Sequence, residues 1–198
     1  LTNHSSGKMG YAIADSALRA GADVTLISGP TNLNPPGVTK LHSVTTAEEM
    51  LRGVNEIIAD MDIFIGVAAV ADYRPKTVRS EKLKKSDASI QIELVPNPDI
   101  LASVTSRSSP PFTIGFAAET TDLVPNARKK LREKKADLIV ANTVGQGGVP
   151  FGTEFNSLIL IDHRDEIDLG SGTKQLLADR LIMEIAPRYY ATNPSSHS

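Results

Sequence analysis

Apolar residues recur along the chain in two patterns, one typical of amphipathic helices and the other of buried strands. Helical spacing predicts helices over residues 8–20, from Thr46 onward, from Pro98 onward, over 123–135 and from Thr173 onward. Short apolar or alternating runs predict strands over residues 24–28, 38–44, 62–67, 90–95, 112–117, 136–141 and 158–162. Thr46 and Glu49 have the spacing of a capping box. Ser5 or Ser6 is expected to cap the first helix, and Asn97 the helix that opens with Pro98.

The order of these elements predicts an α/β fold with a mostly parallel central sheet between two layers of helices. We expect one domain over residues 1–190 and a disordered tail over residues 191–198. The first helix leaves no room for the strand that would normally precede it, so the N-terminal strand is expected to be missing. Open α/β sheets bind ligands beyond the carboxyl ends of their strands, which directs attention to the loops after Val67, Ala117 and Ala141 and to the segment before the first helix.

Composition narrows the classes of function. The chain has 198 residues, 40% hydrophobic and 22% charged, with a formal net charge of -2, so it is not built as a whole for nucleic acid. It contains no Cys, which excludes disulfides, thiolate nucleophiles and Cys-based metal sites. No apolar run reaches the roughly 18 residues of a membrane span, and nothing resembles a secretion signal, so a cytoplasmic location is expected.

Residues 3–10 (NHSSGKMG) combine small polar side chains with a predicted helix start. Backbone N–H groups and the positive end of a helix dipole suit a phosphate there. The spacing is not that of a Walker A loop. The alternative is a capped helix with an exposed Lys8.

Residues 66–75 follow a predicted buried strand and are mostly small, which lets a ligand approach the backbone closely. Asp72 could accept a hydrogen bond from a ribose hydroxyl or lie near a metal ion. A tight turn with a surface aspartate explains the same residues.

Two basic segments are either solvated surface or polyanion contacts. Residues 76–85 have no apolar periodicity, so they are either an exposed charge run or a flap that closes over a polyanion. Lys130 and Lys134 share one helix face; they either stabilise the helix C-terminus or reach across a cleft to a triphosphate. The histidines lack metal-ligand spacing, and no metal ligand is assigned.

Five motifs occur in a characteristic order: NHSSGKMG at 3–10, AAVADY at 68–73, EKLKK at 81–85, NPDI at 97–100 and GFAAE at 115–119. Together they resemble bacterial phosphopantothenate–cysteine ligases. ADLIVAN at 136–142 and FGTEFN at 151–156 extend the resemblance to nearly the whole chain. The resemblance implies a Rossmann-like three-layer αβα domain. It also implies a two-step reaction: 4'-phosphopantothenate is activated by CTP to an acyl-cytidylate, and L-cysteine then displaces CMP to form an amide.

The same resemblance assigns roles to individual positions. It implies that Asn3 and Lys82 are catalytic, with Asn3 holding the acyl-cytidylate and Lys82 offsetting phosphate charge. It implies that CTP is contacted by Lys82 and by Gly66, Val67, Ala68, Asp72, Pro98, Asp99, Ile100, Leu101, Phe116, Lys130 and Lys134. The helix start and the small-residue turn add Ser5, Ser6 and Ala69, with Asn3, as candidates for binding phosphopantothenate.

Further partners follow from the resemblance. Mg²⁺ is expected with the nucleoside triphosphate, held largely by phosphate oxygens and water. A homodimer is implied, as is fusion to or association with a flavin-dependent phosphopantothenoylcysteine decarboxylase; FMN itself is not expected here. No nucleic acid or membrane partner is expected. The alternative enzyme class is an NAD(P)-dependent oxidoreductase, but its Gly-x-Gly-x-x-Gly turn is not visible.

Overall fold

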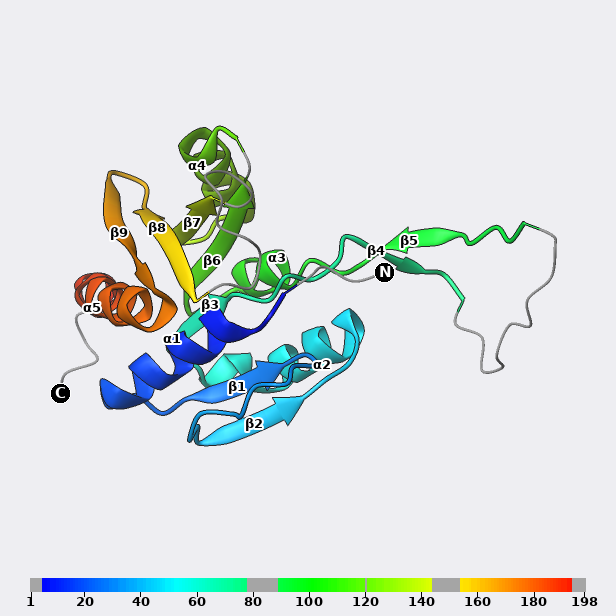
Figure 1. The fold of residues 1–198 in the computed structure, drawn as a ribbon, viewed down its shortest axis with the longest axis horizontal. Coiled ribbons are helices and arrows are strands. Elements are labelled where there is room, and N and C mark those ends of the chain that lie inside the picture. The colour runs from blue at the N-terminus through cyan, green and yellow to red at the C-terminus, as the bar shows by residue number, and fades with distance from the viewer. Residues whose placement is uncertain (1–4, 78–88, 120, 144–153, 194–198) are drawn as a thin grey trace.

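A mixed sheet in the order β3-β6-β7-β8-β9 forms the centre of the computed structural model, which describes residues 5–77, 89–119, 121–143 and 154–193 (Figure 1). Its strands are β3 (Ile63–Gly66), β6 (Phe112–Glu119), β7 (Leu138–Thr143), β8 (Phe155–Ile161) and β9 (Glu166–Thr173). The pairs β3–β6 and β6–β7 are parallel, whereas β7–β8 and β8–β9 are antiparallel. The prediction of a mostly parallel sheet is therefore wrong. β8 and β9 are joined by a short connection, which pairs strands only in the antiparallel sense.

Two further strand pairs lie outside this sheet. β1 (Thr25–Ser28) and β2 (Lys40–Ser43) form a parallel pair. β4 (Tyr73–Pro75) and β5 (Leu94–Pro96) form an antiparallel pair that projects from the body of the molecule (Figure 1). We call this projection the arm. At its base, the Arg74 guanidinium donates to the Pro96 carbonyl and pairs with Glu48 at 2.7 Å.

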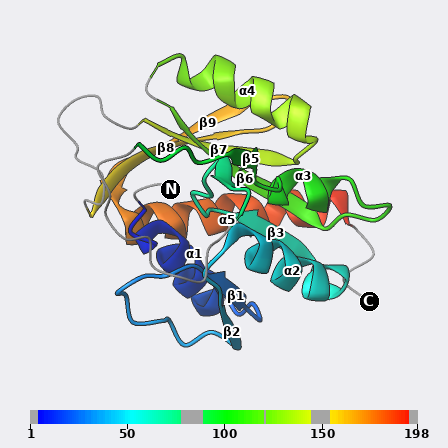
Figure 2. The ribbon, with the colours of Figure 1, turned by 90° about the vertical axis from the view of Figure 1, so that its right-hand side faces the viewer.

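Helices cover both faces of the central sheet (Figure 2). They are α1 (Lys8–Arg19), α2 (Ala47–Ile57), the 3₁₀ helix η1 (Ile58–Asp60), α3 (Ile100–Thr105), α4 (Leu123–Lys134) and α5 (Lys174–Thr192). α1 and α5 pack together on one face, and α4 lies on the other. No helix in the described ranges is long and apolar enough to cross a membrane.

Alternation along the strands divides the core between these two faces. On β7, Leu138 and Val140 belong to the cluster under α1 and α5, whereas Ile139 and Ala141 belong to the cluster under α4. All four are buried. This is the pattern expected of a strand covered on both sides.

Several predicted boundaries need correction. β9 was not predicted, because Gly170, Gly172 and its polar residues weaken the strand pattern. The N-cap of α1 is Gly7, with a positive φ of 73°, rather than Ser5 or Ser6. The N-cap of α3 is Asp99 rather than Asn97, so Pro98 precedes the helix. The expected tail begins too early, since α5 continues to Thr192; residues 194–198 lie outside the described ranges.

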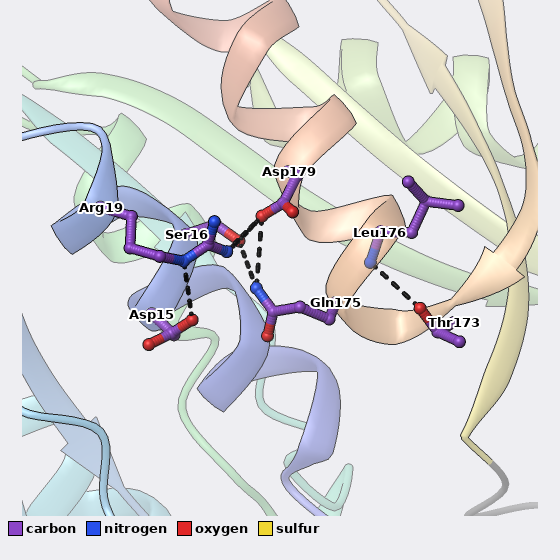
Figure 3. Close-up of polar contacts among 7 residues, drawn as sticks. All are labelled: Asp15, Ser16, Arg19, Thr173, Gln175, Leu176 and Asp179. Atoms are coloured by element: carbon purple, nitrogen blue, oxygen red, sulfur yellow. Dashed lines mark hydrogen bonds and ion pairs between the residues drawn. The ribbon is translucent and has the colours of Figure 1, made fainter.

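A polar network joins α1 to α5 across their packed faces (Figure 3). The buried Ser16 hydroxyl donates to Asp179 at 2.5 Å, and the Gln175 amide donates to Ser16 at 2.9 Å. The Arg19 guanidinium also donates to Asp179, at 2.5 Å. The hydrogen bond from Ser16 lowers the pKa of Asp179; burial opposes this, and further bonds from Arg19 and Gln175 add to the lowering.

Replacing Asp179 by asparagine is expected to destabilise the protein and to flatten its acid denaturation curve. Because the folded-state pKa of Asp179 is depressed below 3.8, its stabilisation is present above that pH and is lost as the pH falls further. Asparagine keeps an acceptor oxygen for the Ser16 hydroxyl and removes only the charge, and exchanging a charged for a neutral acceptor costs about 1–1.5 kcal/mol per hydrogen bond. Thermal unfolding between about pH 2 and 7 measures both effects. Asp15→Asn is the control, since its exposed pair with Arg19 is expected to contribute less than about 1 kcal/mol. Equal effects of the two changes would contradict the assignment.

Candidate functional site

The carboxyl end of β3 lies beside the middle of β6, because Gly66 of β3 pairs in parallel register with Gly115 of β6, and both strands run toward the same edge of the sheet. A Cβ on Gly115 would lie 2.7 Å from Leu101 Cδ2 and 2.8 Å from Ile139 Cδ1. A larger residue at this position would therefore displace the ends of the Leu101 and Ile139 side chains, so glycine favours the close packing of α3 over β6. The Leu101 side chain is used in this packing, and it lies against the core cluster beneath α4.

The loop after β3 presents small residues at this edge. Ala68 and Ala69 are exposed, as is Asp72. Two hydrogen bonds hold the end of the loop against the start of α3: Asn97 N–H donates to the Asp72 carbonyl at 2.8 Å, and the Asn97 side-chain amide donates to the Ala71 carbonyl at 2.8 Å. The backbone there is fixed while the alanines and the Asp72 carboxylate remain accessible.

Asp99 connects α3 to α4. Its carboxylate accepts from the Ala102 N–H at 2.9 Å as the N-cap of α3, and it accepts from Lys134 Nζ at 2.5 Å. Burial acts to raise the pKa of Asp99, but the hydrogen bonds from Ala102 and Lys134 together hold it below its ordinary value. Asp99 is therefore a carboxylate at neutral pH, and it fixes the Lys134 ammonium beside the start of α3.

Lys130 lies one helical turn before Lys134 and is half-buried. Its Nζ donates to the carbonyl of Phe116, within β6, at 2.6 Å. Burial lowers the pKa of the Lys130 ammonium below its ordinary value, and the charge of Lys134 lowers it further. Carboxylates act in the opposite direction, those of Glu119, Asp99 and Asp72.

The structure thus gathers most of the predicted nucleotide residues at one edge. They are Gly66, Val67, Ala68, Asp72, Pro98, Asp99, Ile100, Leu101, Phe116, Lys130 and Lys134. Ile100 packs inward against the cluster of α2 and α3, as Leu101 does against that of α4. The two predicted catalytic residues, Asn3 and Lys82, lie outside the described residues.

Glu119 was not among the predicted site residues, although its charge acts on Lys130. It ends β6, and its carboxylate accepts from the Asn126 side chain at 3.3 Å. The signal that could have found it was its place in the GFAAE motif, where it follows Phe116 at the carboxyl end of the strand.

The start of α1 lies beside the same loop. A Cβ on Gly10 would lie 3.8 Å from the Val67 Cβ, so the two backbones approach closely. Ser5 and Ser6 precede the helix, and the Ser6 hydroxyl accepts from Lys8 N–H at 3.4 Å. With Lys8 and residues 30–33 they line a cavity of about 480 Å³. Lys8 Nζ forms an ion pair with Glu154.

Metal ligands are not assembled at this edge. Within the ranges that the structure describes, no group of three or more His, Asp or Glu side chains is placed to hold a metal ion. The carboxylates around Lys130 neutralise its ammonium instead. The arrangement can therefore bind an anion with lysines and a polar ligand with exposed backbone, but it does not fit a metal held by protein groups alone.

Comparison with known proteins gives a consistent picture. The family model of the DNA/pantothenate metabolism flavoprotein C-terminal domain matches residues 1–189. The bifunctional coenzyme A biosynthesis protein CoaBC of Vibrio vulnificus is 46% identical over 188 residues, covering 93% of this chain and 47% of that protein. CoaBC of Escherichia coli is 45% identical over 197 residues, covering 98% of this chain and 48% of that protein. The chain spans about half the length of these relatives.

Solved structures agree with the fold. A crystal structure of the C-terminal domain of CoaBC matches with a TM-score of 0.79 and 39% identity, covering 95% of this chain and 85% of that one. A structure of Cab2 in complex with phosphopantothenate-cysteine matches with a TM-score of 0.77 at 17% identity, covering 99% of this chain and 82% of that one. At that identity, the second match shows a shared fold.

Proposed function

The chain belongs to the family of the DNA/pantothenate metabolism flavoprotein C-terminal domain, and from this we propose that it is a phosphopantothenate–cysteine ligase that uses CTP. The observation that carries the proposal is the meeting of Asp72, Asp99, Lys130 and Lys134 at the carboxyl edge of β3 and β6. The edge of parallel strands is where Rossmann-like domains bind nucleotides. Two lysines there suit a triphosphate, and an exposed aspartate suits a ribose.

The reaction has two steps. In the first, a carboxylate oxygen of 4'-phosphopantothenate attacks the α-phosphorus of CTP, and the bond to the bridging oxygen breaks, so that pyrophosphate leaves with the electron pair. In the second, the amine of L-cysteine attacks the acyl carbon and loses a proton, and CMP leaves. A free carboxylate is a poor electrophile, so the attached nucleotide supplies the leaving group.

The described residues have distinct parts in the first step. Lys134, held by Asp99, presents positive charge to the phosphates. Lys130 is fixed on the Phe116 carbonyl and adds a second charge in a partly desolvated position, where electrostatic interactions are stronger. The exposed carboxylate of Asp72 is the acceptor for a ribose hydroxyl. The backbone of Gly66, Val67 and Ala68 is open to the nucleotide.

The second substrate lies on the α1 side of the same loop. Ser5, Ser6 and Ala69 are the candidates for binding phosphopantothenate, and the cavity of about 480 Å³ beside Ser5 and Ser6 supplies room for an extended chain. The approach of Gly10 to Val67 places this cavity's helix next to the nucleotide loop. Asn3, which precedes Ser5 in the chain, is proposed to hold the acyl-cytidylate, and Lys82 to offset phosphate charge.

Other components of the proposal rest on the family. Mg²⁺ enters as part of the nucleotide substrate, bound by phosphate oxygens and water. A homodimer is supported by the arm, where Tyr73 and Leu94 are exposed apolar residues on a projecting strand pair. Light scattering at several concentrations measures the oligomeric state. Association with a flavin-dependent decarboxylase and a cytoplasmic location are likewise proposed from the bifunctional relatives.

Pyrophosphate release tests the proposed function. With CTP and 4'-phosphopantothenate, release is expected without cysteine, and amide formation only when cysteine is added. ATP in place of CTP measures the nucleotide preference. Tight binding of NADH together with no binding of CTP would overturn the proposal and favour the oxidoreductase.

A further inference from the structure

Asn97 joins the arm to α3. It follows β5, and its backbone N–H continues the β4–β5 pairing by donating to the Asp72 carbonyl at 2.8 Å. Its side-chain Nδ2 donates to the preceding carbonyl, that of Ala71, also at 2.8 Å. One residue therefore holds two consecutive carbonyls of the loop after β3.

Helix capping does not explain this side chain. The N-cap of α3 is Asp99, whose carboxylate accepts from Ala102 N–H. The Asn97 amide points instead to the loop, away from the helix backbone that an N-cap residue serves. The two hydrogen bonds from Asn97 instead keep the Asp72 end of the loop at a fixed distance from the Asp99–Lys134 pair.

The oxygen end of the Asn97 side chain does not add to stability either. Asn97 Oδ1 is buried, and no group in the described part of the chain donates a hydrogen bond to it. Buried acceptors without donors are disfavoured in folded proteins. The donor bond to Ala71 fixes which end of the amide faces the loop, since Nδ2 alone can donate there.

We infer that Asn97 is a positioning residue for nucleotide binding, which acts by holding the Ala71–Asp72 end of the loop at a fixed distance from Asp99 and Lys134. This inference rests on the proposed function for its kinetic consequence. The positioning itself is a property of the free protein. Loss of the Nδ2 donor frees the Ala71 carbonyl, while the backbone hydrogen bond from Asn97 N–H to the Asp72 carbonyl remains. The loop before Asp72 is then held less tightly, so the Asp72 carboxylate is less well positioned for the ribose while the lysines keep their places.

Asn97→Asp keeps the size of the side chain and removes the donor, but it also adds a negative charge near the proposed nucleotide site. Asn97→Ala removes the donor without adding a charge, so the two variants together separate the two effects. For Asn97→Asp, we expect the KM for CTP to rise about 10-fold, with kcat changed less than about 3-fold and the unfolding temperature nearly unchanged. Asn97→Ala, which also lacks the donor, is expected to show the same split. Exposed Asn55 on α2 gives the matched control: Asn55→Ala should behave as the unchanged protein.

Hydrogen exchange separates this inference from the proposed function. In both Asn97 variants, the backbone amides of residues 67–73 should exchange faster, while those of β6 and β7 keep their rates. This readout needs no turnover, so it decides the positioning role even if the unchanged protein releases no pyrophosphate with CTP. Unchanged exchange in the loop would overturn the inference. Equal losses of kcat and of unfolding temperature, without a change in KM, would also overturn it.

Discussion

Replacing Lys130 by glutamine is expected to lower kcat/KM for CTP by about 10- to 100-fold. Glutamine keeps a donor for the Phe116 carbonyl, so the change removes the charge and little of the packing. A hydrogen bond to a charged group contributes about 1.5–3 kcal/mol, and each 1.4 kcal/mol corresponds to a tenfold rate. Steady-state kinetics with varied CTP measures the effect.

Lys129 supplies the matched control on the same helix. It is exposed and pairs with Glu133 at 3.8 Å along the helix surface, so Lys129→Gln should change kcat/KM less than about twofold. Comparable losses from the two substitutions would show that α4 acts only through its overall positive charge, and would contradict the role given to Lys130.

The pH dependence of the same residue follows from its environment. Burial lowers the pKa of Lys130 below 10.5, so as pH rises its ammonium is lost before that of an ordinary lysine. Activity should therefore decline on the alkaline side below that pH. Lys130→Arg keeps its charge and should move the decline to higher pH; an unmoved decline would assign it to another group.

Replacing Asn3 by alanine is expected to lower kcat by about 10²–10³-fold with a smaller change in KM. The reason is the role proposed from the family motif: a preorganised amide donor that stabilises developing charge at the acyl-cytidylate contributes this much to the rate. Single-turnover measurement of pyrophosphate release, compared with amide formation, shows which step is slowed. Asn55→Ala is again the control. A loss below about threefold in both steps would remove Asn3 from the catalytic machinery.

Much of the fold could be predicted because its local signals are strong. The capping box of Thr46 and Glu49 is confirmed, with Glu49 N–H donating to the Thr46 hydroxyl at 3.1 Å. The helix expected over residues 123–135 is confirmed as α4. β9 was missed because its alternation of apolar and charged residues is short: it includes only Ile167 and Leu169 before Gly170, which has a positive φ, interrupts it. The antiparallel pairing of β8 was missed because strand direction depends on long-range contacts.

Site residues could be predicted where their spacing along the sequence determines their relative positions in a helix. Lys130 and Lys134 are four residues apart, so any helix there places them on one face, and both reach groups within β6 or at the start of α3. The role of Asn97 was misjudged because Asn-Pro is a common helix start, whereas the structure begins α3 at the next acceptor, Asp99. Which residue becomes the N-cap depends on where the chain leaves β5, and that position follows from the pairing of β4 with β5.

A crystal structure of the protein soaked with CTP tests the central claim most directly. The account predicts the nucleotide at the carboxyl edge of β3 and β6, with phosphate oxygens about 3 Å from Lys130 or Lys134 Nζ and the ribose beside Asp72. CTP bound elsewhere, with none of Asp72, Phe116 and Lys130 in contact, would contradict it.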